Sequence, residues 1–190
     1  MQIPNAEMPA HTGTRGVCVF FTGLSGSGKT TLATALDTRI RLAANRATTL
    51  LDGDVVRTHL SSELGFTREH RDLNIQRIGF VASEVVKHGG FVIVSAIAPF
   101  ENARQAARQL VEATGSFYLI HLATPLAVCE ARDVKGLYAK ARVGLLAGFT
   151  GVSDPYEVPV DAEISIDTSV VSVEAGVAHI VSRLKADDVI

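Results

Sequence analysis

The 190-residue chain has no tryptophan, two methionines, two cysteines and a net charge of only −2 at pH 7. Cys18 and Cys129 show no metal-ligand spacing. We therefore expect both to be buried core residues of a protein in a reducing compartment. The near-neutral charge gives no general attraction to nucleic acid or to membranes, so any anionic ligand must be held by local clusters. No apolar run reaches the roughly 20 residues that a membrane span needs.

Other patterns are missing as well. The six histidines form no spaced metal set, and no basic stripe with interleaved aromatic residues predicts a nucleic-acid surface. No Asn-Lys-x-Asp guanine motif is present, which disfavours a switch-type GTPase. The N-terminus is polar and unlike a signal peptide, so we expect a cytoplasmic protein.

Short apolar runs alternate with helix-forming segments along most of the chain. Residues 1–14 mix Pro, Asn, Gly and Thr without periodicity, which predicts a flexible lead-in, and residues 15–190 predict one domain. Val-, Ile-, Leu-, Phe- or Thr-rich runs predict strands over 16–22, 47–52, 91–97, 117–122 and 163–167. The remaining segments predict helices over 28–44, 68–88, 101–113, 125–131 and 171–186. This alternation predicts right-handed βαβ units and a parallel sheet, an α/β fold.

Residues 23–30 read Gly-Leu-Ser-Gly-Ser-Gly-Lys-Thr, a complete G-x-x-x-x-G-K-[ST] phosphate-binding loop, or P-loop. The loop follows an apolar run and leads into helix-forming sequence, which is the setting that the motif needs. Its glycines let backbone N–H groups surround a phosphate, and the helix N-terminus adds partial positive charge. Lys29 would reach the β- and γ-phosphates, and the Thr30 hydroxyl would ligate Mg²⁺. The sequence therefore predicts a site for a nucleoside triphosphate.

Polar residues follow other predicted strands, where open parallel sheets bind their ligands. Asp54 suits Mg²⁺ ligation and could act as the general base for an attacking hydroxyl, and Asp52 is a weaker candidate for the same roles. The alternative for either carboxylate is that it caps the helix that follows. Arg71, Asn74 and Arg77 share one helix face at a spacing of three. Cations and glycines gather at about 132–150, which predicts a mobile lid over phosphates; the alternative is a solvated, charge-rich helix.

Several further blocks resemble one family. They are Leu-Asp-Gly-Asp-x-x-Arg at 51–57, Leu-Gly-Phe-Thr at 64–67, Asn-Ile-x-Arg-Ile-Gly at 74–79, Arg-Asp-Val-Lys-Gly-Leu-Tyr-x-Lys-Ala-Arg at 132–142 and Gly-Phe-Thr-Gly-Val-x-Asp-Pro-Tyr-Glu at 148–157. In this order, and after the P-loop, they closely resemble adenylylsulfate kinase (APS kinase) over roughly residues 15–168. The resemblance implies a three-layer α/β/α P-loop NTPase fold with a five-stranded parallel sheet in the order 2-3-1-4-5.

The resemblance also implies an activity: MgATP-dependent phosphorylation of the 3′-hydroxyl of adenosine 5′-phosphosulfate (APS), giving 3′-phosphoadenosine 5′-phosphosulfate. Lys29 and Asp54 would be catalytic, and Thr30 and Asp54 would hold Mg²⁺. The positions expected to bind ATP are Gly23, Leu24, Ser25, Gly26, Ser27, Gly28, Lys29, Thr30, Thr31, Arg132 and Thr168. The positions expected to bind APS are Asp54, Arg57, Phe66, Arg71, Asn74, Ile97, Lys135, Leu137, Gly148 and Phe149, of which the two phenylalanines would sandwich the adenine.

The chain departs from the family's usual pattern in three places. Val55 stands where Asn is usual, and Leu73 stands where Glu is usual. Ala98-Pro99-Phe100-Glu101 replaces a Ser-Pro-Tyr-Arg-like segment, so a serine and an arginine are lost there. None of these removes Lys29, Asp54 or the two acceptor arginines, so we expect activity, with an altered acceptor affinity or substrate inhibition. The alternatives are a small-molecule kinase with another acceptor and a weakly active nucleotide-binding module of a larger sulfate-activating enzyme. The family further suggests a homodimer, with association or fusion to ATP sulfurylase.

Overall fold

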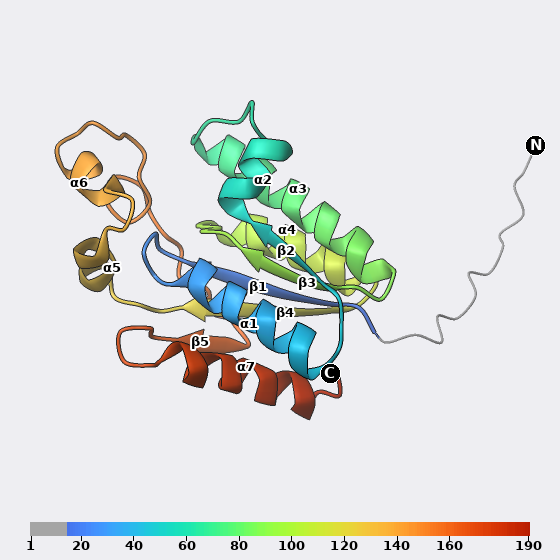
Figure 1. Ribbon diagram of the computed structural model, residues 1–190. Coiled ribbons are helices and arrows are strands. Elements are labelled where there is room, and N and C mark those ends of the chain that lie inside the picture. The colour runs from blue at the N-terminus through green and yellow to red at the C-terminus, as the bar shows by residue number, and fades with distance from the viewer. Residues whose placement is uncertain (1–14) are drawn as a thin grey trace, which may run out of the picture.

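The computed structural model describes residues 15–190, and a five-stranded parallel sheet forms its centre (Figure 1). The strands are β1 (Val17–Gly23), β2 (Thr48–Asp52), β3 (Phe91–Ser95), β4 (Ser116–Leu122) and β5 (Ile164–Ile166). They pair in the order β2-β3-β1-β4-β5, and every pairing is parallel. The structure confirms the α/β fold and the strand order. The predicted lead-in at 1–14 lies outside the described residues.

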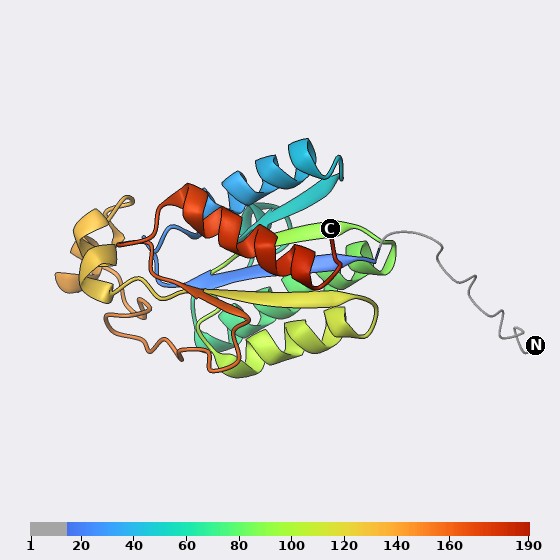
Figure 2. The same ribbon diagram turned by 90° about the horizontal axis from the view of Figure 1, so that it is seen from below.

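Helices cover both faces of the sheet and make three layers (Figure 2). One face carries α1 (Lys29–Ala43) and α7 (Val173–Ala186), and the other carries α3 (Arg68–Lys87) and α4 (Glu101–Glu112). Three shorter helices, α2 (Gly53–His59), α5 (Leu126–Arg132) and α6 (Leu137–Arg142), lie near the carboxyl ends of the strands (Figure 1). Of these, α6 lies in the predicted lid segment and was not predicted as a helix of its own.

The central strand β1 shows why its sequence is apolar at almost every position. Successive side chains of a strand point to opposite faces, so Val19 packs with α1 and α7, whereas Cys18 and Phe20 pack with α3 and α4. All seven β1 residues are buried. A strand covered on both faces therefore reads as a continuous hydrophobic run, as predicted from the sequence.

Local signals set where several helices begin. The side chains of Asp52, Thr67 and Ser172 accept hydrogen bonds from backbone N–H groups in the first turns of α2, α3 and α7. β3 ends at Ser95, which pairs with the last residue of β2, Asp52, rather than at the predicted residue 97. In the part of the chain that the structure describes, no helix has the length and apolarity to cross a membrane.

Candidate functional site

The P-loop joins the last residue of β1 to the first residue of α1 at the carboxyl edge of the sheet. Gly26 and Gly28 have φ values of +75° and +93°, a backbone region that strains other residue types. A Cβ added at Gly26 would lie 2.9 Å from the Cys129 carbonyl oxygen, so glycine is needed there for space as well. The Ser27 N–H donates to the Leu24 carbonyl (3.2 Å) and closes the turn.

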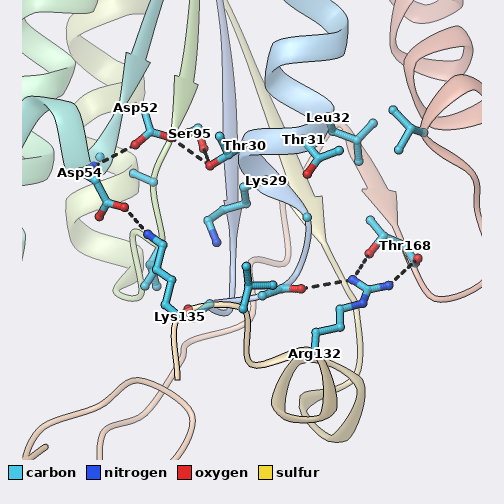
Figure 3. A pocket seen from close by; sticks show the side chains of 18 of the residues that line it. Lys29, Thr30, Thr31, Leu32, Asp52, Asp54, Ser95, Arg132, Lys135 and Thr168 are labelled. Atoms are coloured by element: carbon cyan, nitrogen blue, oxygen red, sulfur yellow. Dashed lines mark hydrogen bonds and ion pairs between the residues drawn. The ribbon is translucent and has the colours of Figure 1, made fainter. Parts of the chain in front are cut away.

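Lys29 projects from the first turn of α1 back towards its own loop. Its Nζ donates to the carbonyl oxygens of Gly23 (3.0 Å) and Leu24 (2.7 Å). Burial lowers the pKa of Lys29 to about 8, with Lys135 as a further, smaller lowering influence. In Figure 3 its side chain lies between the Asp54–Lys135 pair and Arg132. The ammonium group is thus positioned where an anionic ligand of the loop would stabilise its charge.

Oxygen atoms gather beside Thr30. Its hydroxyl donates to Asp52 Oδ2 (3.0 Å) and lies 3.3 Å from Ser95 Oγ. Asp52 also accepts a hydrogen bond from the Asp54 N–H (3.0 Å), so the capping alternative holds for Asp52 while its other oxygen faces the loop. Ser95 was missed from the sequence, although its place at the end of β3 is a usable signal.

Hydroxyl and carboxylate oxygens are the ligands that Mg²⁺ prefers, so the donor set of Thr30 and Asp52 fits that ion. Within residues 15–190, no group of three or more His, Cys, Asp or Glu side chains is arranged to hold a metal ion. Mg²⁺ is commonly held by one or two carboxylates together with substrate phosphates, and this sparse donor set matches that mode. Asp54, the other predicted ligand, lies beside Asp52 but pairs with Lys135.

A cavity of about 470 Å³ opens over the loop, and we call it the P-loop cavity. Its lining includes Ser25, Gly26, Gly28, Lys29, Thr30, Thr31, Arg132 and Thr168, all of them predicted ATP-binding positions. Gly23, Leu24 and Ser27 belong to the loop but do not line the cavity. Arg132 donates to the Gly26 carbonyl (3.1 Å) and to the Thr168 carbonyl (2.8 Å), so these two distant positions meet above the loop (Figure 3).

A second cavity of about 350 Å³ adjoins the first, and we call it the aromatic cavity. All ten predicted APS-binding positions line it: Asp54, Arg57, Phe66, Arg71, Asn74, Ile97, Lys135, Leu137, Gly148 and Phe149. They come from α2, α3 and α6, from the segment between α2 and α3, from the segment between α5 and α6, and from the loops that follow β3 and α6. The structure therefore brings together residues that the chain separates by up to 95 positions (149 − 54).

Arg57 and Phe66 form one wall of the aromatic cavity. The Arg57 guanidinium lies over the Phe66 ring, 4.5 Å from its centroid, and donates to the carbonyl oxygens of Leu64 (3.1 Å) and Gly65 (2.9 Å). Phe66 remains 62% exposed, so one ring face is available to a planar ligand. The cation–π contact and the two hydrogen bonds hold this wall in place. Some N–H donors of Arg57 remain available to a ligand, because both hydrogen bonds come from Nη1.

Arg71 joins α3 to the loop that carries Phe149. Its guanidinium donates to the Phe66 carbonyl (2.8 Å), to Thr150 Oγ1 (2.5 Å) and to the Gly148 carbonyl. It also lies 3.4 Å from Asp154 Oδ2. Most donors of Arg71 therefore have protein partners, so the side chain holds the wall of the cavity in place, and few of its donors remain for an anion.

Asn74 lies one helical turn beyond Arg71 and is 5% exposed. Its Oδ1 is buried and has no hydrogen-bond partner within residues 15–190. Buried polar atoms are nearly always paired, so this acceptor marks a place where a ligand donor fits. Arg77, the third member of the predicted face, pairs with Glu63 (2.6 Å) and does not line the cavity.

Asp54 and Lys135 line both cavities and form an ion pair at their junction (Figure 3). Their side chains are 73% and 59% exposed, respectively. An exposed ion pair contributes little to stability, so a ligand can displace it at small cost. The junction between the cavities therefore carries one carboxylate and one ammonium that are free to rearrange.

The three unusual positions differ in their placement. Val55 and Leu73 are exposed and line neither cavity, so they lie away from the predicted acceptor contacts. Ala98 is buried in the lining of the aromatic cavity with a positive φ, and its carbonyl accepts a hydrogen bond from Arg104 (2.8 Å). The expected effect on acceptor affinity therefore concerns Ala98 directly.

A family model described as adenylylsulphate kinase matches residues 15–167. The chain belongs to the adenylylsulfate kinase family. Among solved structures, the Mycobacterium tuberculosis APS kinase in complex with AMPPNP and APS superposes with a TM-score of 0.86 and 36% identity, over 90% of this chain and 99% of that one. A hexameric APS kinase from Thiobacillus denitrificans superposes with a TM-score of 0.73 and 41% identity, over 93% of this chain and 30% of that one.

Curated relatives are longer proteins. The sulfate adenylyltransferase of Aspergillus oryzae is 51% identical over 179 residues, and that of Phaeosphaeria nodorum is 51% identical over 172 residues. These alignments cover 94% and 90% of this chain but only 31% and 30% of the relatives. The chain therefore spans about a third of the length of these relatives, and what it matches is their APS-kinase-like region.

Proposed function

We propose that this chain is an adenylylsulfate kinase that transfers the γ-phosphoryl group of MgATP to the 3′-hydroxyl of APS. One observation carries the proposal: two cavities, one over the P-loop and one between two phenylalanines, meet at Asp54 and Lys135. A phosphoryl donor in the first cavity and a nucleotide acceptor in the second would place their reacting atoms at that junction. The family membership and the relative crystallised with AMPPNP and APS support the same assignment.

The P-loop cavity would take ATP. Backbone N–H groups of the loop and the N-terminus of α1 suit the phosphates, and Lys29 supplies a cation for the β- and γ-phosphates. Thr30 and Asp52 would hold Mg²⁺, with Asp54 close by; when bound, that ion neutralises charge on the transferring group. Arg132 and Thr168 would lie near the ATP base.

The aromatic cavity would take APS. Phe66 and Phe149 would stack on the adenine, and Arg57 and Arg71 would attract the phosphosulfate through charge-assisted hydrogen bonds. Asn74 would accept a hydrogen bond with its unpartnered Oδ1. The remaining lining positions, Ile97, Lys135, Leu137 and Gly148, would complete the surface around the acceptor.

In the reaction, the 3′-oxygen of APS forms a bond to the γ-phosphorus while the bond from that phosphorus to the β,γ-bridging oxygen breaks. Asp54 would accept the proton of the 3′-hydroxyl, and ADP would leave with the electron pair of the broken bond. Lys135 would leave its pairing with Asp54 and stabilise negative charge on the transferring group. Catalysis of this kind rests on positioning and charge stabilisation.

An ADP-release assay with MgATP, with and without APS, tests the proposal. We expect ADP release to depend on APS and on Mg²⁺, with one 3′-phosphorylated product formed per ADP. Absence of APS-dependent ADP release would refute the assignment, and stimulation by another small alcohol would support a kinase with a different acceptor.

The assembly is a separate proposal. We propose that the chain self-associates as a homodimer, since one relative assembles from several copies into a hexamer. We also propose that it acts beside, or joined to, an ATP sulfurylase, because the longer relatives are sulfate adenylyltransferases. Light scattering of the purified chain tests the first part; a monomer at micromolar concentration would refute it.

A further inference from the structure

A small hydrophobic cluster joins residues of the predicted lid segment to neighbouring residues, and we call it the lid core. Its buried members are Cys129, Tyr138, Ala141 and Phe149, and its partly buried members are Leu24, Leu126, Leu137, Leu146 and Val152. It shares no residue with the two clusters on the faces of the sheet. Because Leu24 belongs to the P-loop and Phe149 lines the aromatic cavity, this cluster connects the P-loop to the wall of the aromatic cavity.

Tyr138 lies at the centre of the lid core and is 1% exposed. Its ring packs edge-on against the Phe149 ring, with centroids 5.0 Å apart and planes at 85°. Its hydroxyl donates to the Ser25 carbonyl oxygen in the P-loop (2.9 Å). Asp133 fixes the start of α6 by accepting from the Tyr138 N–H (3.0 Å). One side chain therefore contacts the phenylalanine of one cavity and the backbone of the other.

The bond to Ser25 has a consequence for the next backbone donor. In a trans peptide the carbonyl of one residue and the N–H of the next point in opposite directions. Tyr138 holds the Ser25 carbonyl towards the lid core, so the Gly26 N–H points away from it. That N–H makes no hydrogen bond to any of residues 15–190, and both Ser25 and Gly26 line the P-loop cavity.

We propose that Tyr138 is a positioning residue for both substrates. Its hydroxyl fixes the Ser25–Gly26 peptide so that the Gly26 N–H serves a phosphate of the donor nucleotide. Its ring packs at nearly a right angle to the Phe149 ring and holds that ring in place beside the acceptor base. The identity of the acceptor rests on the proposed function, whereas the effect on nucleotide binding does not.

The two parts of the side chain are separable by substitution. Tyr138→Phe removes the hydroxyl and keeps the ring, so we expect AMPPNP with Mg²⁺ to bind about three- to tenfold more weakly, the loss typical of one hydrogen bond. The affinity for APS should stay within twofold of the parent. Tyr138→Leu removes the ring as well as the hydroxyl, so APS binding should also weaken by a similar factor in this variant, and unchanged APS affinity would overturn the role of the ring.

Tyr118→Phe is the matched control. Tyr118 is similarly buried and donates to Asp187 (2.9 Å), but it lines neither the P-loop cavity nor the aromatic cavity. Titration calorimetry with AMPPNP and with APS, together with a thermal melt of each variant, gives the comparison. AMPPNP affinity within twofold of the parent in Tyr138→Phe, or an equal loss in Tyr118→Phe, would overturn the proposal. Calorimetry with AMPPNP needs no turnover, so an inactive parent would refute the proposed function and still leave this test decisive.

Discussion

Replacing Asn74 by leucine should stabilise the free protein and impair acceptor binding at the same time. Leucine has nearly the shape of asparagine but carries no polar atoms. Asn74 Oδ1 is buried without a partner among residues 15–190, so the free protein bears a desolvation cost there. Substrate would remove that cost by donating a hydrogen bond, which the leucine variant cannot accept.

The magnitude follows from the burial of the site. An unsatisfied buried acceptor costs about 1–3 kcal/mol, and for a domain of this size each kcal/mol moves the Tm by about 2–4 °C. We therefore expect the Tm of Asn74→Leu to rise by at least about 2 °C without ligand. Loss of the acceptor leaves a substrate donor unpaired at a buried position, and about 1–3 kcal/mol corresponds to a 5- to 150-fold weaker APS affinity.

Thermal melts with and without APS, and calorimetry with APS, measure both effects on one preparation. Asn102→Leu is the control, because Asn102 is exposed on α4 and lines neither cavity. It should leave APS affinity unchanged and move the Tm little. A lower Tm for Asn74→Leu combined with unchanged APS affinity would show that Oδ1 serves the fold and not the ligand.

Three further predictions concern the junction and its surroundings. Burial lowers the pKa of Lys29 to about 8. Because the phosphates of AMPPNP favour the charged lysine, AMPPNP affinity should weaken as the pH rises above 8, and calorimetry in two buffers should detect proton uptake on binding. A flat affinity from pH 7 to 9 would contradict this. Asp54→Asn should lower kcat by at least about 100-fold while AMPPNP affinity stays within twofold, and retained turnover would remove Asp54 as the base. Arg57→Ala should raise the KM for APS about tenfold and leave the KM for ATP within twofold, since Arg57 lines only the aromatic cavity; equal effects on both would count against that placement.

Much of the fold followed from local patterns in the chain. Buried strands read as continuous apolar runs, and the P-loop motif by itself located the carboxyl edge of the sheet. The strand order came from the resemblance, because short parallel strands do not specify their neighbours by composition. β5 covers only Ile164–Ile166, the middle of its predicted span 163–167, and pairs with β4 at the edge of the sheet.

Parts of the site depend on distances that the sequence does not contain. Leu73 directly precedes Asn74, yet one residue turns a helix by about 100°, so Leu73 faces solvent while Asn74 faces the cavity. Helical spacing alone also grouped Arg77 with Arg71, but Arg77 forms an ion pair with Glu63 in the loop before α3. The bond from Tyr138 to Ser25 joins residues 113 positions apart, and no local pattern indicates it.

The separateness of the lid core bears on how the molecule opens. Unfolding α5 and α6 would expose only this small cluster and would leave both clusters on the sheet intact. Cooperative units with few contacts open at lower free energy than the whole domain, so amide hydrogens of α6 should exchange with solvent through local opening. Those of β1 should exchange only through global unfolding. Amides of a segment that lines the aromatic cavity would then be less protected than those of the sheet, and access to that cavity would need no disruption of the sheet.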